Sequence, residues 1–385
     1  MIDPKVTFVV PCYNLAHFLE ECVSSILSQS YSDFEVLIMD DCSPDNTPEV
    51  AKSFADPRVI HVRNKTNLRH LANYNKGIKL ARGEYIWLIS ADDRLRRPYI
   101  LEQYVTLMDK RPEVGYVFCP AIELADDHET ELLAYSFHGA QDSIFEGRKF
   151  LNKLLEGNTV VAASGMVRRE CYEKVSLFPL DMPYAGDWYL WCIFALYYDV
   201  AYFSEPMVDY RSHNQTMTNL LMKANYNIFR DGIAVLTRIR DKSLIKGEDT
   251  IVMKCNDRLD RMITGYVNQI VLCNDNFIKS SVNEFEGLLR DYTLNDRRKL
   301  GARFYVQLAD YYYCSGETAE ARRYYLRALN RDWRLMKVWI KFIFLAFGKL
   351  GVHIRTFISD LRRRAAQKKT ADMGNSLDSE SGKRS

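Results

Sequence analysis

Short apolar strands alternate with amphipathic helices over the first 120 residues, and this alternation limits the fold more than any other feature. Five runs of branched and aromatic residues have the composition of strands that are covered on both faces. The helical patterns between them stop at glycine or start at proline, as helices commonly do. The predicted strands are 6–10, 35–39, 59–62, 85–89 and 114–118, and the predicted helices are 15–27, 48–54, 71–81 and 98–109. We therefore predict an α/β fold with a mostly parallel sheet wound with helices.

Proline and threonine set two of these boundaries. Pro11 is expected to end the first strand, because proline is a strong breaker of regular structure. Thr47 precedes the helix that starts at Pro48, so its hydroxyl is expected to cap that helix.

The chain beyond residue 120 follows a different pattern. Residues 120–215 are irregular, and the segments beyond about 225 have helical patterns. Seven residues within 305–333 have the spacing of one tetratricopeptide-type helical hairpin: Leu308, Ala309, Tyr312, Gly316, Ala321, Tyr325 and Ala328. About three such units are needed for an independent solenoid, so we expect this hairpin to pack against neighbouring helices. The predicted domains are an α/β domain of residues 1–220 and a helical domain of residues 221–333.

The last part of the chain combines an apolar stretch with a basic run. The apolar stretch 339–347 is interrupted by Lys341, and the basic residues after it are Lys349, Arg355, Arg362, Arg363, Arg364, Lys368 and Lys369. Residues 334–370 therefore fit a helix at a membrane interface, and they fit equally well a core helix with a solvated charged end. Residues 371–385 are polar and lack aromatic side chains, so we expect them to be disordered.

Composition excludes several classes of protein. The chain has 385 residues, too many for one ordinary core, with 47% hydrophobic and 26% charged residues, as in soluble globular proteins. A net charge of +2 implies no overall field for a polyanion, so we predict no nucleic-acid partner. The nine cysteines are scattered without a CxxC pair, which favours reduced thiols and a cytoplasmic location. We recognise no secretory signal and no run of the roughly 18 apolar residues that span a membrane.

Two adjacent carboxylates follow the fourth predicted strand. Asp92 and Asp93 come shortly after the buried run 85–89, and ligands of open α/β sheets bind at the carboxyl ends of strands. Hard oxygen donors side by side suit Mg²⁺ or Mn²⁺, and such a cation can hold a diphosphate. An isolated Asp-Asp pair more often starts a turn, so the assignment depends on the other motifs of the chain.

Six separated motifs occur in one order over roughly residues 5–217. They are 9–14 (VVPCYN), 40–47 (DDCSPDNT), the stretch 67–86, 90–93 (SADD), 186–191 (GDWYLW) and 210–218. Together they resemble the family 2 glycosyltransferases, which are nucleotide-sugar enzymes of the GT-A type. Each motif is weak evidence alone, but their common order and spacing make a specific match. The resemblance implies a GT-A fold for the first domain, followed here by an α-helical C-terminal region.

The resemblance implies a nucleotide site at the start of the chain. Pro11, Tyr13, Asn14 and Asp41 match positions that hold the nucleotide. An aromatic ring can stack on a base, and a carboxylate can accept a hydrogen bond from its imide N–H. Tyr13 also fits an aromatic residue of the core, and Asp41 also fits a turn residue that bonds its own backbone.

The resemblance also implies a metal and diphosphate site. Asp92 matches the carboxylate that meets the divalent metal, Mn²⁺ or Mg²⁺, and Asp93 beside it is assigned to the ribose or to metal-bound water. Arg211 and His213 match a loop that closes near the diphosphate. The forked guanidinium suits phosphate recognition. His213 is assigned to the diphosphate or the metal, although a lone histidine is more often structural.

Asp187 matches the general base of the family. Transfer with inversion requires a carboxylate on the face opposite the leaving group, where it takes the proton of the acceptor hydroxyl. The alternative is that Asp187, which follows Gly186 at the start of a predicted helix, serves as the helix N-cap.

The chain departs from the family pattern at three positions. Ser90 stands where the family often has a carboxylate, and a hydroxyl is a weaker anchor for ribose or metal-bound water. Arg69 stands where many members have glycine, and Tyr74 where many have arginine. Arg69 therefore either replaces the missing positive charge near a phosphate or is an exposed residue at a helix start.

These features predict an inverting glycosyltransferase. The donor is expected to be a nucleotide-diphospho-sugar, most often a uridine nucleotide in such families. The acceptor is expected to be a glycan, lipid-linked and at the inner face of the cell membrane, because of the apolar and basic C-terminal segment. A nucleotidyltransferase would need a glycine-rich phosphate loop, which residues 11–14 do not provide. A non-catalytic scaffold is the third interpretation, supported by the helical hairpin near residue 305.

Overall fold

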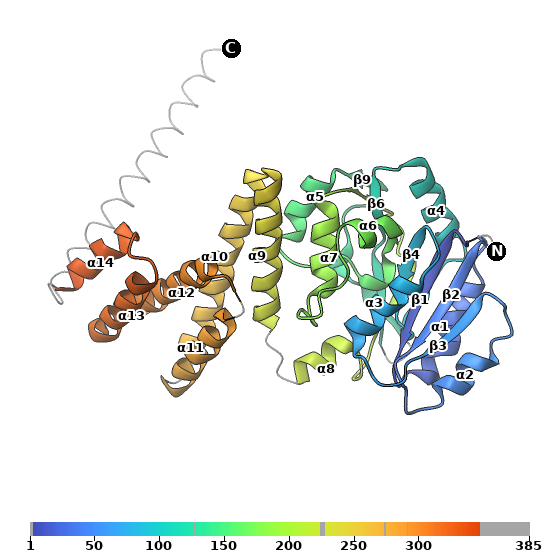
Figure 1. The fold of residues 1–385 in the computed structure, drawn as a ribbon, viewed down its shortest axis with the longest axis horizontal. Coiled ribbons are helices and arrows are strands. Elements are labelled where there is room, and N and C mark those ends of the chain that lie inside the picture. Colours follow the sequence, from blue (N-terminus) through green and yellow to red (C-terminus); the bar gives the residue numbers. More distant parts are fainter. Residues whose placement is uncertain (1–2, 126–127, 224–227, 273–274, 291, 347–385) are drawn as a thin grey trace, which may run out of the picture. The chain divides into compact units, whose positions relative to one another are not determined.

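The computed structural model describes residues 3–125, 128–223, 228–272, 275–290 and 292–346. The chain forms two compact units, Met1–Leu259 and Asp260–Ser385. Residues 347–385 lie outside the described residues, and they include most of the predicted membrane-surface segment and all of the predicted disordered tail. Figure 1 follows the chain from the strands of the first unit to the helices of the second.

The first unit contains a large, mainly parallel sheet. Among the described residues its strand order is β3-β2-β1-β4-β10-β6-β11-β9. Strand β1 pairs in parallel with β2 and β4, β2 pairs in parallel with β3, and β10 is antiparallel to both β4 and β6. The bounds are β1 (Val6–Cys12), β2 (Phe34–Asp40), β3 (Val59–Arg63), β4 (Tyr85–Leu88), β6 (Val114–Phe118), β9 (Ser143–Phe145), β10 (Met166–Arg168) and β11 (Asp199–Tyr202). The predicted α/β class is confirmed.

A second, smaller sheet was not predicted. Its order is β5-β12-β7-β8, with β5 (Arg94–Leu95), β7 (Ala121–Ala125), β8 (His128–Leu132) and β12 (Val208–Ser212). Strand β5 starts directly after Asp93 and pairs with β12 through Arg94 and Asp209. This sheet therefore places the closing motif of residues 210–218 beside the loop that carries the two adjacent aspartates.

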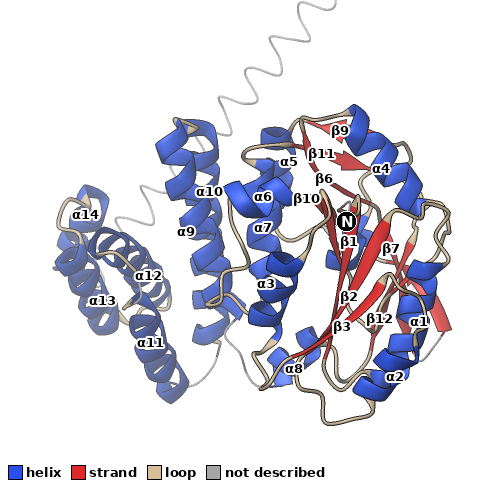
Figure 2. Cartoon of the chain, turned by 45° about the vertical axis from the view of Figure 1, so that its right-hand side comes forward, coloured by secondary structure: helices blue, strands red, loops and turns tan. Residues whose placement is uncertain are grey.

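Helices cover both faces of the main sheet (Figure 2). Residues of α1 (Ala16–Leu27), α2 (Thr47–Ser53) and α4 (Ile100–Lys110) join one core cluster with β1, β2 and β4. Helices α3 (His70–Leu80), α6 (Arg169–Lys174) and α7 (Gly186–Ala195) lie on the other side. The remaining helices of this unit are η1 (Ala134–Ser136), α5 (Gly147–Leu154), η2 (Ala162–Ser164), α8 (Met217–Lys223), α9 (Ile228–Lys246) and the first part of α10 (Asp249–Val271).

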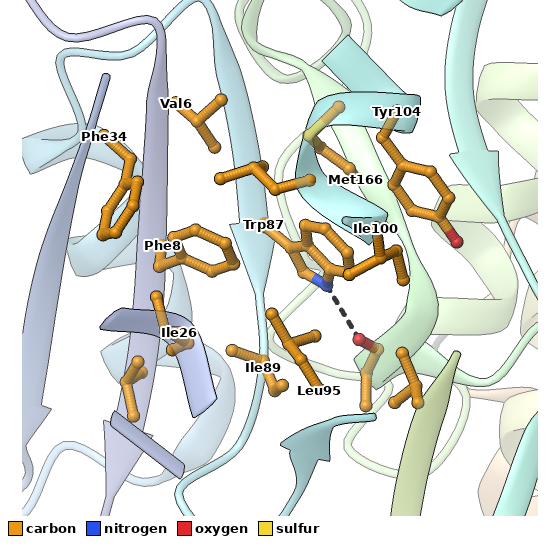
Figure 3. Close-up of a cluster of buried hydrophobic side chains, with 14 of the residues drawn as sticks. Val6, Phe8, Ile26, Phe34, Trp87, Ile89, Leu95, Ile100, Tyr104 and Met166 are labelled. Carbon is orange, nitrogen blue, oxygen red and sulfur yellow. Dashed lines mark hydrogen bonds between the residues drawn. The ribbon is translucent and has the colours of Figure 1, made fainter. Parts of the chain in front are cut away.

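Stacked aromatic side chains fix strand β4 in the core (Figure 3). Phe8 meets the edge of Phe34 with ring centroids 5.6 Å apart and stacks on Trp87 at 5.4 Å, and Trp87 stacks on Tyr104 at 4.9 Å. Trp87 is fully buried, and its indole N–H donates to the Ala163 carbonyl at 2.8 Å. A buried indole both contributes a large apolar area and needs such a partner. The loop after β4 therefore starts from a rigid strand.

Gly77 allows α3 to approach the sheet closely, and we expect an added methyl group there to destabilise the fold. A Cβ at residue 77 would lie 2.4 Å from Val9 Cγ1 and 3.1 Å from Met39 Cγ. Overpacking costs about 1–3 kcal/mol, whereas alanine gains only about 0.5–1 kcal/mol of helix propensity. Gly77→Ala should therefore lower the midpoint of thermal unfolding.

Gly265 provides the matched control for this prediction. It lies inside α10, and a Cβ there meets no atom within 4 Å. Gly265→Ala should leave the unfolding midpoint unchanged or raise it through helix propensity alone. Equal effects of the two substitutions would contradict the close contact between α3 and β1.

Two predicted boundaries differ from the structure. Strand β1 continues through Pro11 to Cys12. The Pro11 backbone faces the β4 side of the strand, where β4 has already ended at Leu88. Proline therefore costs no hydrogen bond between the two strands at this position. Thr47 is the first residue of α2, not its cap. Asp45 accepts hydrogen bonds from the Thr47 amide at 3.1 Å, the Thr47 hydroxyl at 2.6 Å and the Ala16 amide at 3.0 Å. Asp45 thus ties together the starts of α1 and α2.

The second unit is helical in its described residues. It contains the end of α10, α11 (Asp275–Leu289), α12 (Leu294–Cys314), α13 (Thr318–Arg331) and α14 (Met336–Ala346). Helices α12 and α13 form the predicted hairpin, with Gly316 at a φ of 85° between them and Tyr312 stacked on Tyr324 at 5.5 Å. In the part of the chain that is described, none of the helices has both the length and the apolar character needed to cross a membrane.

We predicted the boundary between the units at residue 220, but it lies later in the chain, after Leu259. Helix α9 belongs to the first unit together with the sheet. Its buried carboxylate Asp231 accepts hydrogen bonds from the backbone amides just before α7. A contact of this kind has no signal in the local sequence pattern of α9.

Candidate active site

The carboxyl ends of β1, β2 and β4 meet at one edge of the main sheet. The amide of Asp41, just after β2, donates to the Cys12 carbonyl at 2.9 Å. The amide of Ala91, after β4, donates to the Pro11 carbonyl at 3.1 Å. The end of β1 therefore lies between the loops that carry Asp41 and Asp92, which is where open α/β sheets bind ligands.

Asp41 is held by the loop between β3 and α3. The side chain is buried, and its Oδ1 accepts from Asn64 Nδ2 and from the Leu68 amide, both at 2.8 Å. Asn64 in turn donates to Asn73 Oδ1 at 2.8 Å and accepts from Lys76 Nζ at 2.5 Å. The carboxylate is therefore more than a turn residue that bonds its own backbone, because both of its partners come from a later loop.

Three further predicted binding residues surround Asp41 in loops. The Tyr13 side chain is 49% exposed, so it is not the core aromatic that was the alternative. Asn14 has a φ of 58° and Arg69 a φ of 68°, a region that is strained for residues other than glycine and that occurs often at functional sites. Arg69 is exposed, and its side chain has no hydrogen bond or ion pair among the described residues. The exposed Tyr13 and Arg69 thus directly follow Cys12 and Leu68, whose backbones are hydrogen-bonded to Asp41.

The four residues predicted for the metal and the diphosphate are in direct contact. The Arg211 amide donates to Asp93 Oδ1, and Arg211 Nε donates to the Asp92 carbonyl, both at 2.9 Å. His213 Nε2 lies 3.0 Å from Asp92 Oδ2. Arg211 is buried, and its guanidinium lies 4.4 Å from the centre of the Phe18 ring. In this arrangement Arg211 holds the loop of the two aspartates in place.

The tautomer of His213 follows from its neighbours. The Gln215 amide donates to His213 Nδ1 at 3.2 Å, so Nδ1 acts as an acceptor and Nε2 carries the ring proton. His213 therefore donates to Asp92 and orients its carboxylate. A cation could bind Nε2 only if the hydrogen bond from Gln215 to Nδ1 were given up.

A network of charges anchors the aspartate loop to α1 and β12. Arg94, the residue after Asp93, donates to Asp209 Oδ2 at 2.6 Å and pairs with Glu21 of α1. Arg211 also bonds Glu21, at 2.5 Å. Asp209 is buried, and a buried carboxylate is stable when paired in this way. The position of the loop is thus determined by residues of two other segments, α1 and β12.

The residues around Asp92 fit a divalent cation. Asp92 Oδ1 is buried and has no hydrogen-bond partner within the described residues, which leaves one anionic oxygen unused. No cluster of three or more His, Cys, Asp or Glu side chains with a metal-site arrangement occurs in that part of the chain. Mg²⁺ commonly binds through one or two carboxylates together with substrate phosphates. Asp92 Oδ1 is therefore enough as the protein ligand of such a site.

Asp187 lies inside the first turn of α7. The N-cap of this helix is Ala185 and the first residue is Gly186, so the N-cap alternative does not apply. One carboxylate oxygen accepts from the Trp188 amide at 2.7 Å, and the other accepts from Asn158 Nδ2 at 2.9 Å. Burial raises the pKa of Asp187 to about 6, although these two hydrogen bonds act in the opposite direction. A carboxylate with a pKa near the operating pH is suited to accept a proton.

Asp187 and the aspartate pair act on the same tyrosines. Burial and the negative charges of Asp92, Asp187 and Asp93 raise the pKa of Tyr74. Burial and the charges of Asp187 and Asp93 likewise raise the pKa of Tyr135 to about 12. Carboxylates that are far apart in the sequence therefore face one region of the first unit.

Helix α3 contacts both sides of this region. Asn73 takes part in the network around Asp41, and Nδ2 of its side chain donates to the Met39 carbonyl at 2.9 Å. Three residues earlier, His70 Nε2 bonds the Pro183 carbonyl at 2.8 Å in the loop before α7. A single short helix thus joins the loop around Asp41 to the segment that leads to Asp187.

Helix α9 fixes the start of α7 from the opposite direction. Oδ2 of Asp231, which is buried, accepts from the Tyr184 amide at 2.8 Å and the Ala185 amide at 3.1 Å. The Ala185 amide, at the N-cap of α7, is one of the free N–H groups at the helix start, and a carboxylate is a favourable partner there. Asp231 therefore positions the turn that carries Asp187.

The prediction from sequence missed the residues that orient the predicted ones. Asn158 bonds Asp187, Asn64 bonds Asp41, and Glu21, Asp209 and Asp231 hold the loops. Each reaches its partner across 23 to 190 residues of sequence. No local motif marks such residues, because their spacing along the chain follows the fold and not a periodic pattern.

Comparison with known proteins agrees with this geometry. Residues 7–176 match the family model described as glycosyl transferase family 2. The chain is 26% identical over 253 residues to a protein of Rickettsia typhi named as an uncharacterized glycosyltransferase, covering 64% of this chain and 76% of that protein. It is 27% identical over 226 residues to a glycosyltransferase of Haemophilus influenzae with the same kind of name, covering 55% and 67%.

A solved structure shares the fold. Residues 1–349 of S. aureus TarS, in complex with UDP-GlcNAc, superpose with a TM-score of 0.60 at 14% identity, covering 86% of this chain and 93% of that one. At this identity the likeness concerns the fold. The match to glycosyl transferase family 2 covers residues 7–176, and the chain is a glycosyltransferase with the GT-A fold.

Proposed function

We propose that this enzyme transfers a sugar, with inversion, from a nucleotide-diphospho-sugar to a hydroxyl of a glycan acceptor, with Asp187 as the general base. The observation that carries the proposal is the common region faced by Asp92, Asp93 and Asp187, in which burial brings the pKa of Asp187 to about 6. A base of that kind is deprotonated at neutral pH and still able to hold a proton.

The donor would bind along the carboxyl edge of β1, β2 and β4. Asp41 would accept from the base, Tyr13 would stack on it, and Pro11 and Asn14 would line the same loop. We propose uridine as the nucleoside, and the complex of the fold neighbour TarS with UDP-GlcNAc supports this choice. Arg69, with its free guanidinium, would approach a phosphate.

Asp92, with its unused oxygen, would hold Mn²⁺ or Mg²⁺, and Asp93 would bind the ribose or a metal-bound water. A divalent cation there would neutralise the negative charge that develops on the departing nucleoside diphosphate. His213 and Arg211 would keep the two aspartates in the orientation that this requires.

The transfer itself would be a single displacement. Asp187 takes the proton of the acceptor hydroxyl, and that oxygen forms a bond to the anomeric carbon. The bond between the anomeric carbon and the phosphate oxygen breaks, and its electron pair leaves with the nucleoside diphosphate. Attack from the face opposite the leaving group converts an α-linked donor into a β-linked product. Asn158 would keep the Asp187 carboxylate turned toward the acceptor.

The acceptor would be a lipid-linked glycan in the synthesis of a cell-surface polysaccharide. This proposal rests on the apolar and basic composition of residues 334–370, because an enzyme with such a segment would work at the inner face of a membrane.

Calorimetry with nucleoside diphosphates tests the proposed function. We expect UDP to bind more tightly in the presence of Mn²⁺, by about tenfold or more, because Asp92 would hold a cation that offsets the negative charge of the diphosphate. Thymidine and guanosine diphosphates serve as the comparison for the base. An absence of binding for all three nucleotides, with or without Mn²⁺, would favour a non-catalytic scaffold.

A further inference from the structure

Positive charge is concentrated in one segment of the chain. Residues 322–370 contain fourteen Lys and Arg against two Asp and Glu, a net charge of +12, whereas the whole chain has a net charge of only +2. All other residues together therefore have a net charge of −10. Such an asymmetry indicates an anionic partner for this segment even though the chain as a whole is nearly neutral.

Helix α14, within this segment, exposes an apolar face. Met336, Trp339, Ile340 and Ile343 have exposed fractions of 68%, 38%, 53% and 55%. Their spacing of three and four residues places them on one side of the helix. We call these four residues the α14 face.

The remainder of α14 is packed within the second unit. Val338 and Leu345 are buried, and Lys341 reaches Asp310 of α12 at 2.5 Å and lies over the Tyr325 ring of α13 at 5.8 Å. The helix is thus anchored by its other side, and the α14 face is the side that the described residues leave uncovered.

Tryptophan and basic side chains accompany the α14 face. Trp333 is 67% exposed, and its carbonyl accepts from Trp339 Nε1 at 2.8 Å. Lys337 lies on the same helix and is exposed. Tryptophan, aliphatic and basic residues together are the composition of elements that lie in the interface between a bilayer and water.

We propose that the α14 face docks on the surface of an anionic phospholipid bilayer, to which the positive charge of residues 322–370 attracts it. The aliphatic side chains enter the boundary between headgroups and acyl chains, and the basic side chains contact the headgroups. Nucleic acid fits this face less well, because three of its four side chains are methionine or isoleucine and only Trp339 offers an aromatic plane for base stacking. A second copy of the chain is disfavoured, because two segments of charge +12 repel each other. This inference does not depend on the proposed sugar transfer.

Vesicle binding by the full chain tests the inference. The probes are vesicles of phosphatidylcholine alone and vesicles of phosphatidylcholine and phosphatidylglycerol in equal amounts, with co-sedimentation as the measurement. We expect binding to the anionic vesicles to be at least about tenfold tighter, since each basic side chain near such a surface contributes attraction. High salt should release the protein, because it screens this attraction.

Two matched variants distinguish insertion of the α14 face from nonspecific adsorption of exposed apolar side chains. The double variant Trp339→Ser and Ile340→Ser should lower the partition coefficient on anionic vesicles by about tenfold or more, because two apolar side chains no longer insert. The double variant Leu244→Ser and Ile245→Ser removes an exposed apolar pair on α9, at 54% and 81% exposure, and should bind as the natural chain does. Circular dichroism checks that both variants fold.

Three results would overturn the inference. The first is equal binding to neutral and anionic vesicles, which would remove the role of charge. The second is unchanged binding of the Trp339→Ser and Ile340→Ser variant. The third is that the natural chain dimerises as its concentration rises, without binding vesicles, and that the Trp339→Ser and Ile340→Ser variant stays monomeric. This result would assign the α14 face to a second copy of the chain.

Discussion

Asp187→Asn should lower kcat by about a thousandfold while the fold is preserved, because the amide keeps the shape of the side chain but does not accept a proton at neutral pH. The remaining oxygen can accept from the Asn158 side chain or from the Trp188 amide but not from both, which costs about 1 kcal/mol. The stability of the variant should nevertheless stay close to that of the natural enzyme, because a second effect acts in the opposite direction. Burial raises the pKa of Asp187 to about 6, so above its unfolded-state pKa the ionised carboxylate opposes folding, and a neutral amide removes that opposition. Transfer assays and thermal unfolding at neutral pH measure the two effects.

The pH dependence gives the same prediction a second readout. For the natural enzyme, kcat/KM should fall as the pH decreases through about 6, where Asp187 takes up a proton and no longer serves as a base. The residual activity of Asp187→Asn should lack this step. Asp181→Asn, which changes an exposed carboxylate in the loop before α7, is the control and should retain activity. Full activity of Asp187→Asn would remove the base assignment.

Asp92→Asn should abolish the dependence of UDP binding on Mn²⁺ and lower kcat/KM by at least about a hundredfold. The natural side chain offers a buried oxygen without a partner, and the amide replaces an anionic oxygen by a neutral group. The amide oxygen can still accept from His213 Nε2, so the loop should keep its conformation. Calorimetry with UDP, with and without Mn²⁺, measures the effect without any acceptor.

The control for this variant is Asp142→Asn. Asp142 is exposed and accepts from the Ser204 amide and hydroxyl, away from the aspartate loop. Its substitution should change neither the affinity for UDP nor the effect of Mn²⁺. If Mn²⁺ still strengthened UDP binding to Asp92→Asn as it does for the natural enzyme, the cation would have to bind elsewhere. If the variant lost this effect of Mn²⁺ but kept its transfer activity, the metal would be dispensable for transfer.

The part of the fold that could be predicted from the sequence is the part whose strands have a strong local pattern of apolar residues. Strands β1, β2 and β4 are runs of buried branched and aromatic residues, and such runs can be recognised without knowledge of their neighbours. The second sheet could not be predicted, because β5 has two residues and β8 is mostly exposed and polar. Its strands depend on pairing with segments distant in the chain and not on their own composition.

The candidate site divides in the same way. Asp92 follows a recognisable strand and Asp187 lies at a recognisable helix start, so the local structure around each of them was predictable. The bond between His213 and Asp92, by contrast, joins residues 121 positions apart. Its geometry depends on β12 lying beside β5, a pairing that only the folded chain provides.

The hydrogen bonds that Asp231 accepts have a consequence for exchanging parts between related enzymes. Helix α9 would be taken from sequence alone as the first piece of an interchangeable helical module. In the folded chain its carboxylate holds the turn ahead of α7, so a chimera joined near residue 220 would import a foreign helix into the catalytic framework. A junction near residue 259 leaves that framework whole.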